Sequence, residues 1–221
     1  MATTGVISSL LRRIQKLENE NRALKADARR LREENRRWAR MAGTEALTGL
    51  PNKISFVRAM IPQTIQRASE AGKPVGFILL SADNLGDINE TYGRQAGDQV
   101  IRGLGELLKS LLGDDDRVGH IDGTNFAVIL YPADLDTVRG RSNMLRARVR
   151  AHGFPCADTT AQITISAGIM SIEPSADADR RALSEETFRL LNGALYMAKK
   201  AGGNRVEVVQ STNSDGGEAA R

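Results

Sequence analysis

The sequence of 221 residues contains one cysteine, two histidines and only 4% aromatic residues, and these shortages exclude several classes of protein. The single cysteine, Cys156, cannot form an internal disulfide, which excludes a disulfide-stapled secreted fold and fits a reducing cytoplasm. His120 and His152 have no second histidine or cysteine at ligand spacing, so a zinc site is not expected. Because aromatic residues are so few, we expect the core to be built from Leu, Ile, Val and Ala.

Long apolar runs are also missing. No apolar segment approaches the ~20 residues that a helix needs to cross a bilayer, and the N-terminus lacks the basic and apolar segments of a secretory signal. We therefore expect a cytoplasmic protein without a membrane span. The net charge of +4 is unevenly placed, because residues 1–41 carry eleven Lys or Arg against five Asp or Glu. The basic character belongs to this N-terminal segment.

Residues 7–38 carry a heptad repeat without Pro or Gly, which predicts a coiled coil. The residues at positions a and d, which would face a partner helix, are Ile7, Leu10, Ile14, Leu17, Asn21, Leu24, Ala28, Leu31, Asn35 and Trp38. Asn21 and Asn35 at a positions favour a parallel, in-register dimer, because each amide can hydrogen-bond its partner across the axis. Opposite charges would also meet across a parallel homodimer: Arg13 with Glu18, Glu20 with Lys25, and Asp27 with Arg32.

Two other interpretations of residues 7–38 stay open. One is a single helix with a solvated, charged face, although an isolated helix has little stability of its own. The other is a DNA-binding leucine zipper. Such a zipper carries its basic residues in a separate N-terminal region, whereas here they interleave with the heptads, so we do not expect nucleic-acid binding.

After a joint at residues 41–44, apolar patterns of helical and strand period alternate. We expect helices at 53–71, 90–112, 135–151 and 185–200, and strands at 75–80, 126–131, 162–172 and 206–209. Pro62 is expected to end or kink the first of these helices, and Asp122-Gly123 to form the turn of a hairpin. The alternation predicts a sheet covered by helices. Residues 210–221 lack an apolar pattern, which predicts disorder.

Five segments, in order and at matching spacing, resemble the motifs of the GGDEF domain, which has the diguanylate cyclase fold. They are residues 47–53, 89–98, 122–126 at the place of the signature, 163–169 and 194–204. The resemblance implies an α/β (α+β) fold with a central, largely antiparallel sheet of the nucleotidyl-cyclase palm type, flanked by helices. We therefore expect a long, parallel dimeric coiled-coil helix at 1–43, a degenerate GGDEF domain at 44–209 and a disordered tail at 210–221.

The resemblance implies a reaction, the condensation of two GTP molecules, that needs a divalent metal on hard oxygen ligands and cations on the leaving pyrophosphate. It places the metal-binding aspartate of the first core strand at Ser81. It places the two acidic residues of the signature at Thr124 and Asn125. A neutral hydroxyl is a poor sole replacement for a carboxylate on a metal, and an amide cannot act as a base near pH 7.

Other positions implied by the resemblance are altered too. Asp122 stands where the first glycine of the signature lets the backbone approach the nucleotide, and Gly123 follows it. Gly86 and Gly203 replace a lysine and an arginine of the family, whereas Lys199 is retained. We therefore expect no bound magnesium, no other cofactor and no diguanylate cyclase activity.

The part of the site that would recognise guanine is retained, since Asn89 and Asp98 match the positions that hydrogen-bond the base in the family. A structural role is the alternative, with Asn89 capping the helix that follows it and Asp98 lying on the face of that helix. Asn89, Asp98 and Lys199 are therefore the candidates for nucleotide binding.

A displaced metal site is a further alternative. Side chains two apart on a strand share a face, so Asp83 would lie on the side of Ser81, and Asp122 would lie on that of Thr124. Two carboxylates placed in this way could replace the missing ligands.

The segment before the signature departs from the family in two places. The product-inhibition motif RxxD would begin at Gly113 and end at Asp116, so its arginine is missing and cyclic di-GMP is not expected to bind there. His120 takes the place of an arginine, and we interpret it as a hairpin residue.

The sequence therefore favours a catalytically inactive GGDEF protein that serves as a dimeric regulatory or protein-interaction scaffold in bacterial signalling. An unidentified protein partner would bind the coil, the former active-site edge or the arginine-rich helix around residues 139–150. One alternative is a sensor that binds GTP or cyclic di-GMP weakly. The other is a cyclase-like enzyme with an altered metal site.

Overall fold

The computed structural model describes residues 2–156 and 159–209, and within its first helix the side chains of residues 13–32 and Glu34. The chain divides into two units, Met1–Ala42 and Gly43–Arg221. The predicted heptad side chains of Ile7, Leu10, Asn35 and Trp38 lie outside the described side chains, and the predicted tail lies outside the described residues.

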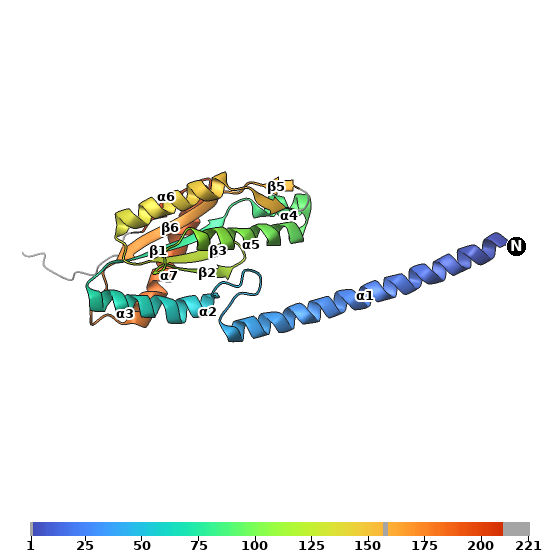
Figure 1. The fold of residues 1–221 in the computed structure, drawn as a ribbon, viewed down its shortest axis with the longest axis horizontal. Helices are drawn as coiled ribbons and strands as arrows, with labels where there is room; N and C mark the ends of the chain where they lie inside the picture. Colours follow the sequence, from blue (N-terminus) through green and yellow to red (C-terminus); the bar gives the residue numbers. More distant parts are fainter. Residues whose placement is uncertain (1, 157–158, 210–221) are drawn as a thin grey trace, which may run out of the picture. The chain divides into compact units, whose positions relative to one another are not determined.

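The first unit is one helix, α1 (Ala2–Ala42), labelled in Figure 1. Four of its heptad residues are large, apolar and more than half exposed in the single chain: Ile14 at 51%, Leu17 at 56%, Leu24 at 69% and Leu31 at 59%. A repeated apolar stripe of this kind is typical of a helix face that is buried against another helix.

The second unit is built on a five-stranded sheet with the order β2-β3-β1-β6-β7. The strands are β1 (Val75–Ala82), β2 (Arg117–Asp122), β3 (Asn125–Leu130), β6 (Ile165–Ile172) and β7 (Val206–Val208). All neighbouring strands pair antiparallel except β6 and β7, which run parallel. The sheet is therefore largely antiparallel, and the predicted α+β architecture is confirmed.

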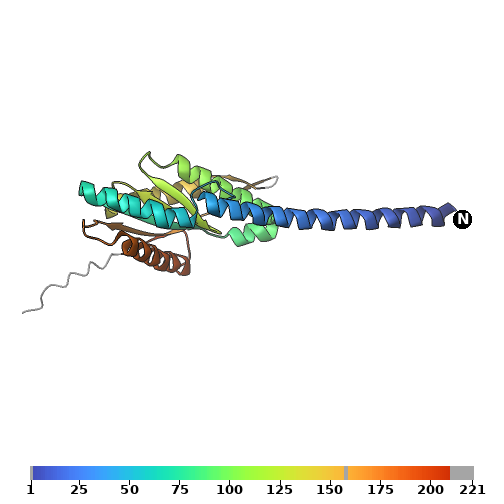
Figure 2. The same ribbon diagram turned by 90° about the horizontal axis from the view of Figure 1, so that it is seen from below.

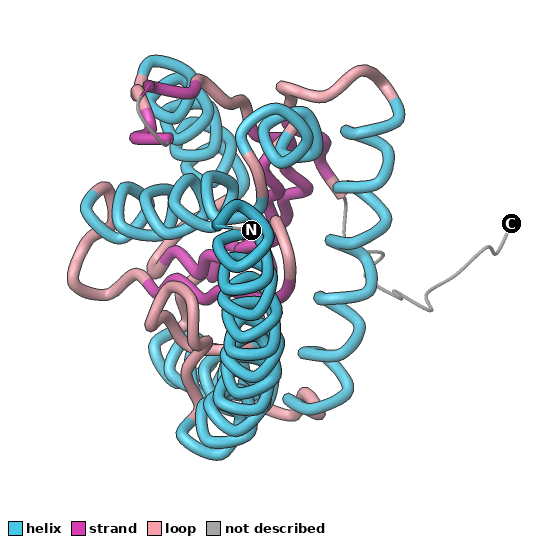
Figure 3. Tube along the Cα trace, turned by 90° about the vertical axis from the view of Figure 1, so that its right-hand side faces the viewer, coloured by secondary structure: helices cyan, strands magenta, loops and turns pink. Residues whose placement is uncertain are grey.

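Helices cover both faces of this sheet (Figures 2 and 3). They are α2 (Lys53–Ser55), a π-helical turn (Phe56–Met60), α3 (Ile61–Ala71), α4 (Leu85–Tyr92), α5 (Arg94–Ser110), α6 (Leu135–Ala151) and α7 (Arg180–Lys200). The central strand β1 is buried along its whole length. Its alternate side chains enter two cores, Ile78 and Leu80 with α5 and α6, and Phe77 and Leu79 with α3 and α7.

The helix expected at 90–112 is wrong, because two helices occupy this region. Gly93 has a φ of 83°, which glycine adopts readily, and it separates α4 from α5. Asn89 lies in the last turn of α4, where its carbonyl accepts the N–H of Gly93 at 3.0 Å. Asn89 therefore does not cap the start of a helix, as one alternative proposed.

Four other local features differ from what the sequence patterns predict. The helix at 53–71 contains a π-helical turn before Pro62, whose ring cannot accommodate a regular turn on its N-terminal side. The last long helix begins at Arg180, because Asp179 caps the N–H groups of residues 181 and 182. The strand expected from 162 begins at Ile165. A short hairpin, β4 (Phe154–Cys156) and β5 (Thr159–Ala161), was not expected.

The predicted hairpin is present, but its turn is shifted by one residue. Asp122 pairs with Asn125 across the two strands, so the turn residues are Gly123 and Thr124 rather than Asp122 and Gly123. A bulge between His120 and Asp122 shifts the register. Within the described residues, no helix is long and apolar enough to cross a bilayer.

The packing of α7 on the sheet depends on Gly168 in β6. A Cβ atom at this position would lie 2.6 Å from the carbonyl oxygen of Leu191 and 2.7 Å from the nitrogen of Leu195. We expect Gly168→Ala to lower the free energy of unfolding by about 1–3 kcal/mol, because α7 must move away. Urea unfolding followed by circular dichroism measures this change.

Gly140→Ala is the matched control, since a Cβ atom at this position in α6 meets nothing within 4 Å. We expect it to raise the free energy of unfolding by up to ~1 kcal/mol, as alanine favours helix. Equal stability of wild type and Gly168→Ala would contradict the close approach of α7 to β6.

Candidate functional site

Four segments meet at one edge of the sheet, which we name the site edge: residues 81–83, 122–125, 164–166 and 203–204. Backbone hydrogen bonds join them, from Ala82 N–H to the carbonyl of Thr124 at 3.0 Å and from Asp83 N–H to the carbonyl of Thr164 at 2.8 Å. The structure therefore brings together the end of β1, the hairpin turn and the start of β6.

Ser81 and Thr124 are hydrogen-bonded to each other at this edge. Their hydroxyl oxygens are 2.8 Å apart, and Ser81 is completely buried. Each hydroxyl can donate or accept, so the pair satisfies itself without a cation. Two carboxylates at the same separation would repel each other and would need a metal ion or a proton between them.

Asp83 has both carboxylate oxygens occupied. It accepts hydrogen bonds from the hydroxyls of Thr164 at 2.7 Å and Ser166 at 2.8 Å, and from the backbone N–H of Asn204 at 2.9 Å. Gly203 brings the loop after α7 close to this carboxylate, since a Cβ atom there would lie 3.3 Å from it. Asp83 thus connects β1, β6 and the loop after α7.

Asp122 and Asn125 likewise interact with each other, through the amide Nδ2 of Asn125 and Oδ1 of Asp122 at 2.6 Å. The described part of the chain contains no group of three or more His, Cys, Asp or Glu side chains placed to hold a metal ion. The displaced site of two carboxylates therefore stays a prediction.

Asn89 and Asp98, the residues predicted to bind guanine, lie close together. The amide oxygen of Asn89 is against the backbone of Gly97, where it occupies the space that a Cβ atom would need. Asp98 follows directly in α5 and is exposed. Lys199 is exposed in the last turn of α7, and no hydrogen bond or ion pair in the described structure joins it to either residue.

Asp116, the last residue of the expected product-inhibition motif, is held inside the domain. Its carboxylate accepts from the N–H of Gly113 at 2.9 Å, from the N–H of Tyr131 at 3.3 Å and from Nη2 of Arg141 at 2.8 Å. These contacts give Asp116 a structural role at the end of the α5–β2 turn.

The arginine-rich helix α6 is therefore not simply a free surface. Arg141 binds Asp116, and Arg146 donates to the carbonyl and side-chain oxygens of Asn204 at 3.3 and 3.1 Å. The backbone N–H of Asn204 also binds Asp83, so Arg146 is linked to the site edge through Asn204. Arg148 and Arg150 are exposed on the same helix.

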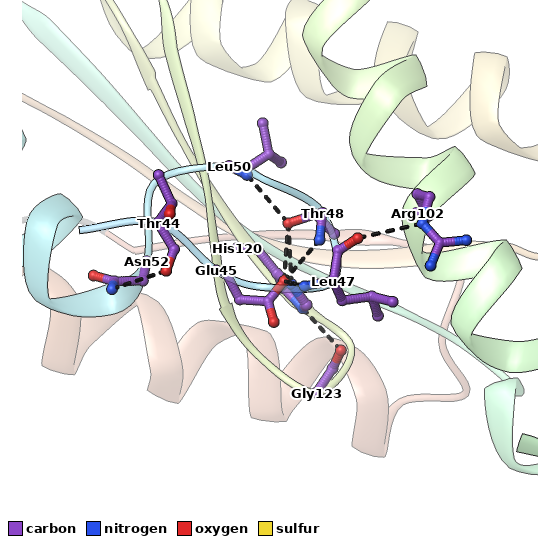
Figure 4. A network of polar contacts seen from close by, with 9 residues as sticks. All are labelled: Thr44, Glu45, Leu47, Thr48, Leu50, Asn52, Arg102, His120 and Gly123. Carbon is purple, nitrogen blue, oxygen red and sulfur yellow. Dashed lines mark hydrogen bonds and ion pairs between the residues drawn. The ribbon is translucent and has the colours of Figure 1, made fainter. Parts of the chain in front are cut away.

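One contact between His120 and a carboxylate was missed by the sequence reasoning. His120 is 3% exposed in β2, and its Nδ1 lies 2.8 Å from Oε2 of Glu45, while its Nε2 lies 2.9 Å from the carbonyl of Gly123 (Figure 4). The ring stacks on Phe126 with centroids 4.5 Å apart. His120 is in the hairpin, as expected, but Glu45 gave no signal because its partner is 75 residues further along the chain.

The carboxylate of Glu45 is favoured by the contacts around it. Burial raises its pKa, but the hydrogen bond from His120 and those from the N–H groups of Leu47 and Thr48 lower it, and the net pKa lies below the ordinary value. The two N–H distances are 3.0 and 2.9 Å. Glu45 is thus an ionised acceptor at neutral pH.

Comparison with known proteins identifies the family to which the chain belongs. Residues 42–205 match the family model described as "Diguanylate cyclase, GGDEF domain". The chain belongs to the GGDEF family. The suspected resemblance is therefore confirmed over the domain that carries the site edge.

Curated relatives of this GGDEF protein are diguanylate cyclases. Diguanylate cyclase DgcP of Pseudomonas aeruginosa is 29% identical over 93% of this chain and 28% of its own length. Diguanylate cyclase DgcM of Escherichia coli K12 is 30% identical over 73% of this chain and 37% of its own length. The chain spans about a third of the length of these relatives.

Solved structures show the same fold. The coiled coil and GGDEF domain of DgcB from Caulobacter crescentus, solved with c-di-GMP, is 26% identical, with a TM-score of 0.67 over 87% of this chain and 99% of that one. Diguanylate cyclase SiaD of Pseudomonas aeruginosa, solved with its activator SiaC, has a TM-score of 0.67 at 20% identity, over 94% of this chain and 77% of that one. The palm-type fold of this GGDEF domain is thereby confirmed.

The contact between the hydroxyls of Ser81 and Thr124 predicts how carboxylates at these positions would respond to metal. We expect Ser81→Asp with Thr124→Asp to place two carboxylates in contact at a buried position. In EDTA the double variant should lose about 3 kcal/mol of stability or more, because a buried charge is left uncompensated. Mg²⁺ or Mn²⁺ should restore much of the melting temperature by binding only the folded state.

Differential scanning fluorimetry with and without metal measures both effects. The matched control is Ser81→Ala with Thr124→Val, which removes both hydroxyls without adding charge and should not respond to metal. A double aspartate variant that ignores both EDTA and Mg²⁺ would contradict the close approach of residues 81 and 124.

Proposed function

We propose that this GGDEF domain is catalytically inactive and serves as a dimeric regulatory or protein-interaction scaffold in bacterial cyclic di-GMP signalling. The observation that carries the proposal is the 2.8 Å hydrogen bond between the hydroxyls of Ser81 and Thr124. These are the two positions at which the family resemblance places carboxylates that bind metal.

The chemistry of GTP condensation explains why this hydrogen bond matters. Attack of a 3′-hydroxyl on an α-phosphorus needs a divalent cation to neutralise the developing charge, and the cation needs hard, anionic oxygen ligands. The two hydroxyls are neutral and already bonded to each other. Asn125 carries no base, and its amide is bonded to Asp122. We therefore infer that magnesium is not a cofactor of this domain.

The part of the site that would contact the phosphates of GTP lacks two cations, which the resemblance implies at the positions of Gly86 and Gly203. A side chain at position 203 would also meet Asp83, and Asp122 adds an exposed negative charge beside the turn. A triphosphate would thus meet less positive charge here than the reaction needs. The missing cations support loss of catalysis independently of the missing metal ligands.

Dimerisation through α1 is the second part of the proposal. The exposed apolar stripe of Ile14, Leu17, Leu24 and Leu31 needs a partner helix to be buried. The flanking charges attract in a parallel homodimer, and Asn21 would fix its register. The DgcB structure likewise combines a coiled coil with a GGDEF domain, which supports this arrangement. A protein partner would then bind the dimer.

A guanine-nucleotide sensor is the alternative function. The observation that favours it is the proximity of Asn89 to the Gly97-Asp98 segment, which keeps both base-recognising positions at one corner. Without metal ligands or phosphate cations, binding would depend on the base alone and would be weak.

Incubation of the full chain with GTP and Mn²⁺ or Mg²⁺, followed by chromatography, tests the proposal. We expect no cyclic dinucleotide, because no metal can be held at residues 81 and 124. An active diguanylate cyclase in parallel samples is the control. Formation of cyclic di-GMP would overturn the proposal. Thermal shift in the same samples separates a scaffold, which shows no shift, from a sensor, which GTP or cyclic di-GMP would stabilise.

The dimer is tested by changing Leu17 and Leu24 together to Lys. We expect the mass measured by light scattering to fall to that of a monomer, because four like charges would face each other in the coil. The matched control changes Ala23 and Ala26 to Lys, which adds the same charge away from the a and d positions. An unchanged mass for the Leu17→Lys and Leu24→Lys variant would reject the heptad assignment.

A further inference from the structure

The outward face of α7 carries apolar side chains that no described element covers. Tyr196 is 63% exposed and Met197 is 57% exposed, and the exposed Gly193 and the partly buried Leu190 precede them on the same face. The opposite face of the helix is the one that packs on the sheet, through Thr187, Leu191, Ala194, Leu195 and Ala198. Figure 2 shows α7 on the outer side of the domain.

The exposed face is centred on Gly193. Residues three, four and seven positions away on either side of this glycine lie on one side of a helix. We name this set, together with Gly193, the α7 stripe, and its other members are Glu186, Arg189, Leu190, Tyr196, Met197 and Lys200. None of these side chains is fully buried. A second helix laid along α7 would contact the whole stripe.

Gly193 itself is not required by the packing of its own domain. A Cβ atom at this position would meet nothing within 4 Å. Glycine in the interior of a helix costs roughly 0.5–1 kcal/mol relative to alanine. A glycine in the middle of an exposed face does, however, let the backbone of a second helix approach closely, because the distance between helix axes depends on the side chains at the crossing.

The charges of the α7 stripe fit a second copy of the stripe. If two copies of α7 cross antiparallel at Gly193, Lys200 of one copy lies opposite Glu186 of the other, since both are seven residues from the glycine. Lys200 has no hydrogen bond or ion pair in the described part of the chain. Glu186 accepts from Nε of Arg189 at 2.7 Å in its own helix, and its exposed carboxylate has room for a second cation.

The uncharged part of the α7 stripe is self-complementary too. In the same crossing Tyr196 lies opposite Leu190, and Met197 lies opposite the methylene stem of Arg189, which can cover apolar surface. No two like charges face each other. The exposed apolar side chains would therefore be buried by the same face of another copy.

We propose that α7 pairs with α7 of a second copy of this chain, antiparallel and crossing at Gly193. Both copies use the same face, so the contact closes after two domains, and it can share one two-fold axis with a parallel coiled coil. The proposal rests on the dimer of the proposed function, because the coil would tether two domains at an effective concentration of about millimolar. One helix pair buries less than the roughly 1,200 Å² of a stable interface, so free domains stay apart at micromolar concentration.

Disulfide formation in the full chain tests this contact. Gly193→Cys places two thiols next to the two-fold axis, where the Cα atoms come within the roughly 4–7 Å that a disulfide needs. Asn192→Cys is the matched control, since this exposed position lies about 100° away around the helix. Under mild oxidation with copper phenanthroline we expect Gly193→Cys to form covalent dimer at least roughly tenfold faster. The native Cys156 is buried and common to both variants.

Charge variants in the Gly193→Cys background test the register of the two helices. Lys200→Glu places like charges opposite each other twice in the symmetric contact, and at low salt it should slow disulfide formation about fivefold or more. Adding Glu186→Lys restores opposite charges and should return the rate to within about twofold of the parent. Arg148→Glu makes the same change of charge at an exposed position of α6 and should leave the rate unchanged.

The coil and the α7 contact can be judged separately. With Leu17→Lys and Leu24→Lys added, Gly193→Cys should form little disulfide at micromolar chain but should recover it at about 1 mM. Its advantage over Asn192→Cys should persist at the higher concentration. A monomer mass for the wild-type chain in light scattering would reject the coil, whereas this ratio of rates decides the α7 contact.

Two results would overturn the pairing of α7, provided that circular dichroism shows folded variants. One is an equal rate for Gly193→Cys and Asn192→Cys at about 1 mM, which would mean that the α7 stripe is free or is covered by something other than a second copy. The other is a failure of Glu186→Lys to rescue Lys200→Glu.

Discussion

The hydrogen bond between Ser81 and Thr124 is the interaction on which the character of this domain depends. It joins the end of β1 to the turn of the β2–β3 hairpin, and the Ser81 side of the bond is completely buried. A buried polar group must find a partner within the protein. Two hydroxyls find that partner in each other, whereas two carboxylates would find it in a cation. The choice of residue thus decides whether the site edge needs metal.

The same logic extends to the remaining polar groups of the site edge. Asp83 accepts hydrogen bonds from Thr164 just before β6, from Ser166 in β6 and from Asn204 in the loop after α7, and Arg146 in turn binds Asn204. Asp116 is held by Arg141 in the same manner. The carboxylates of Asp83 and Asp116 therefore stabilise the fold. This supports a role in which the domain presents a rigid surface.

The loop at residues 43–52 gives this rigid domain its connection to the N-terminal helix. Glu45 and His120 tie the loop to the hairpin, while Asn52 forms a parallel bridge to the backbone of His120. Any signal that passes along the chain between α1 and the domain must cross residues 43–52.

The sequence by itself indicated the family, most strands of the main sheet and the heptad pattern, because motif spacing and apolar periodicity are local properties. It also located Ser81, Thr124 and Asn125. Only the tertiary structure decided what these residues do, since the Ser81–Thr124 bond and the Glu45–His120 pair join residues 43 and 75 positions apart. The break at Gly93 and the shifted turn at Gly123 were likewise set by backbone conformation and strand register, which no local pattern records.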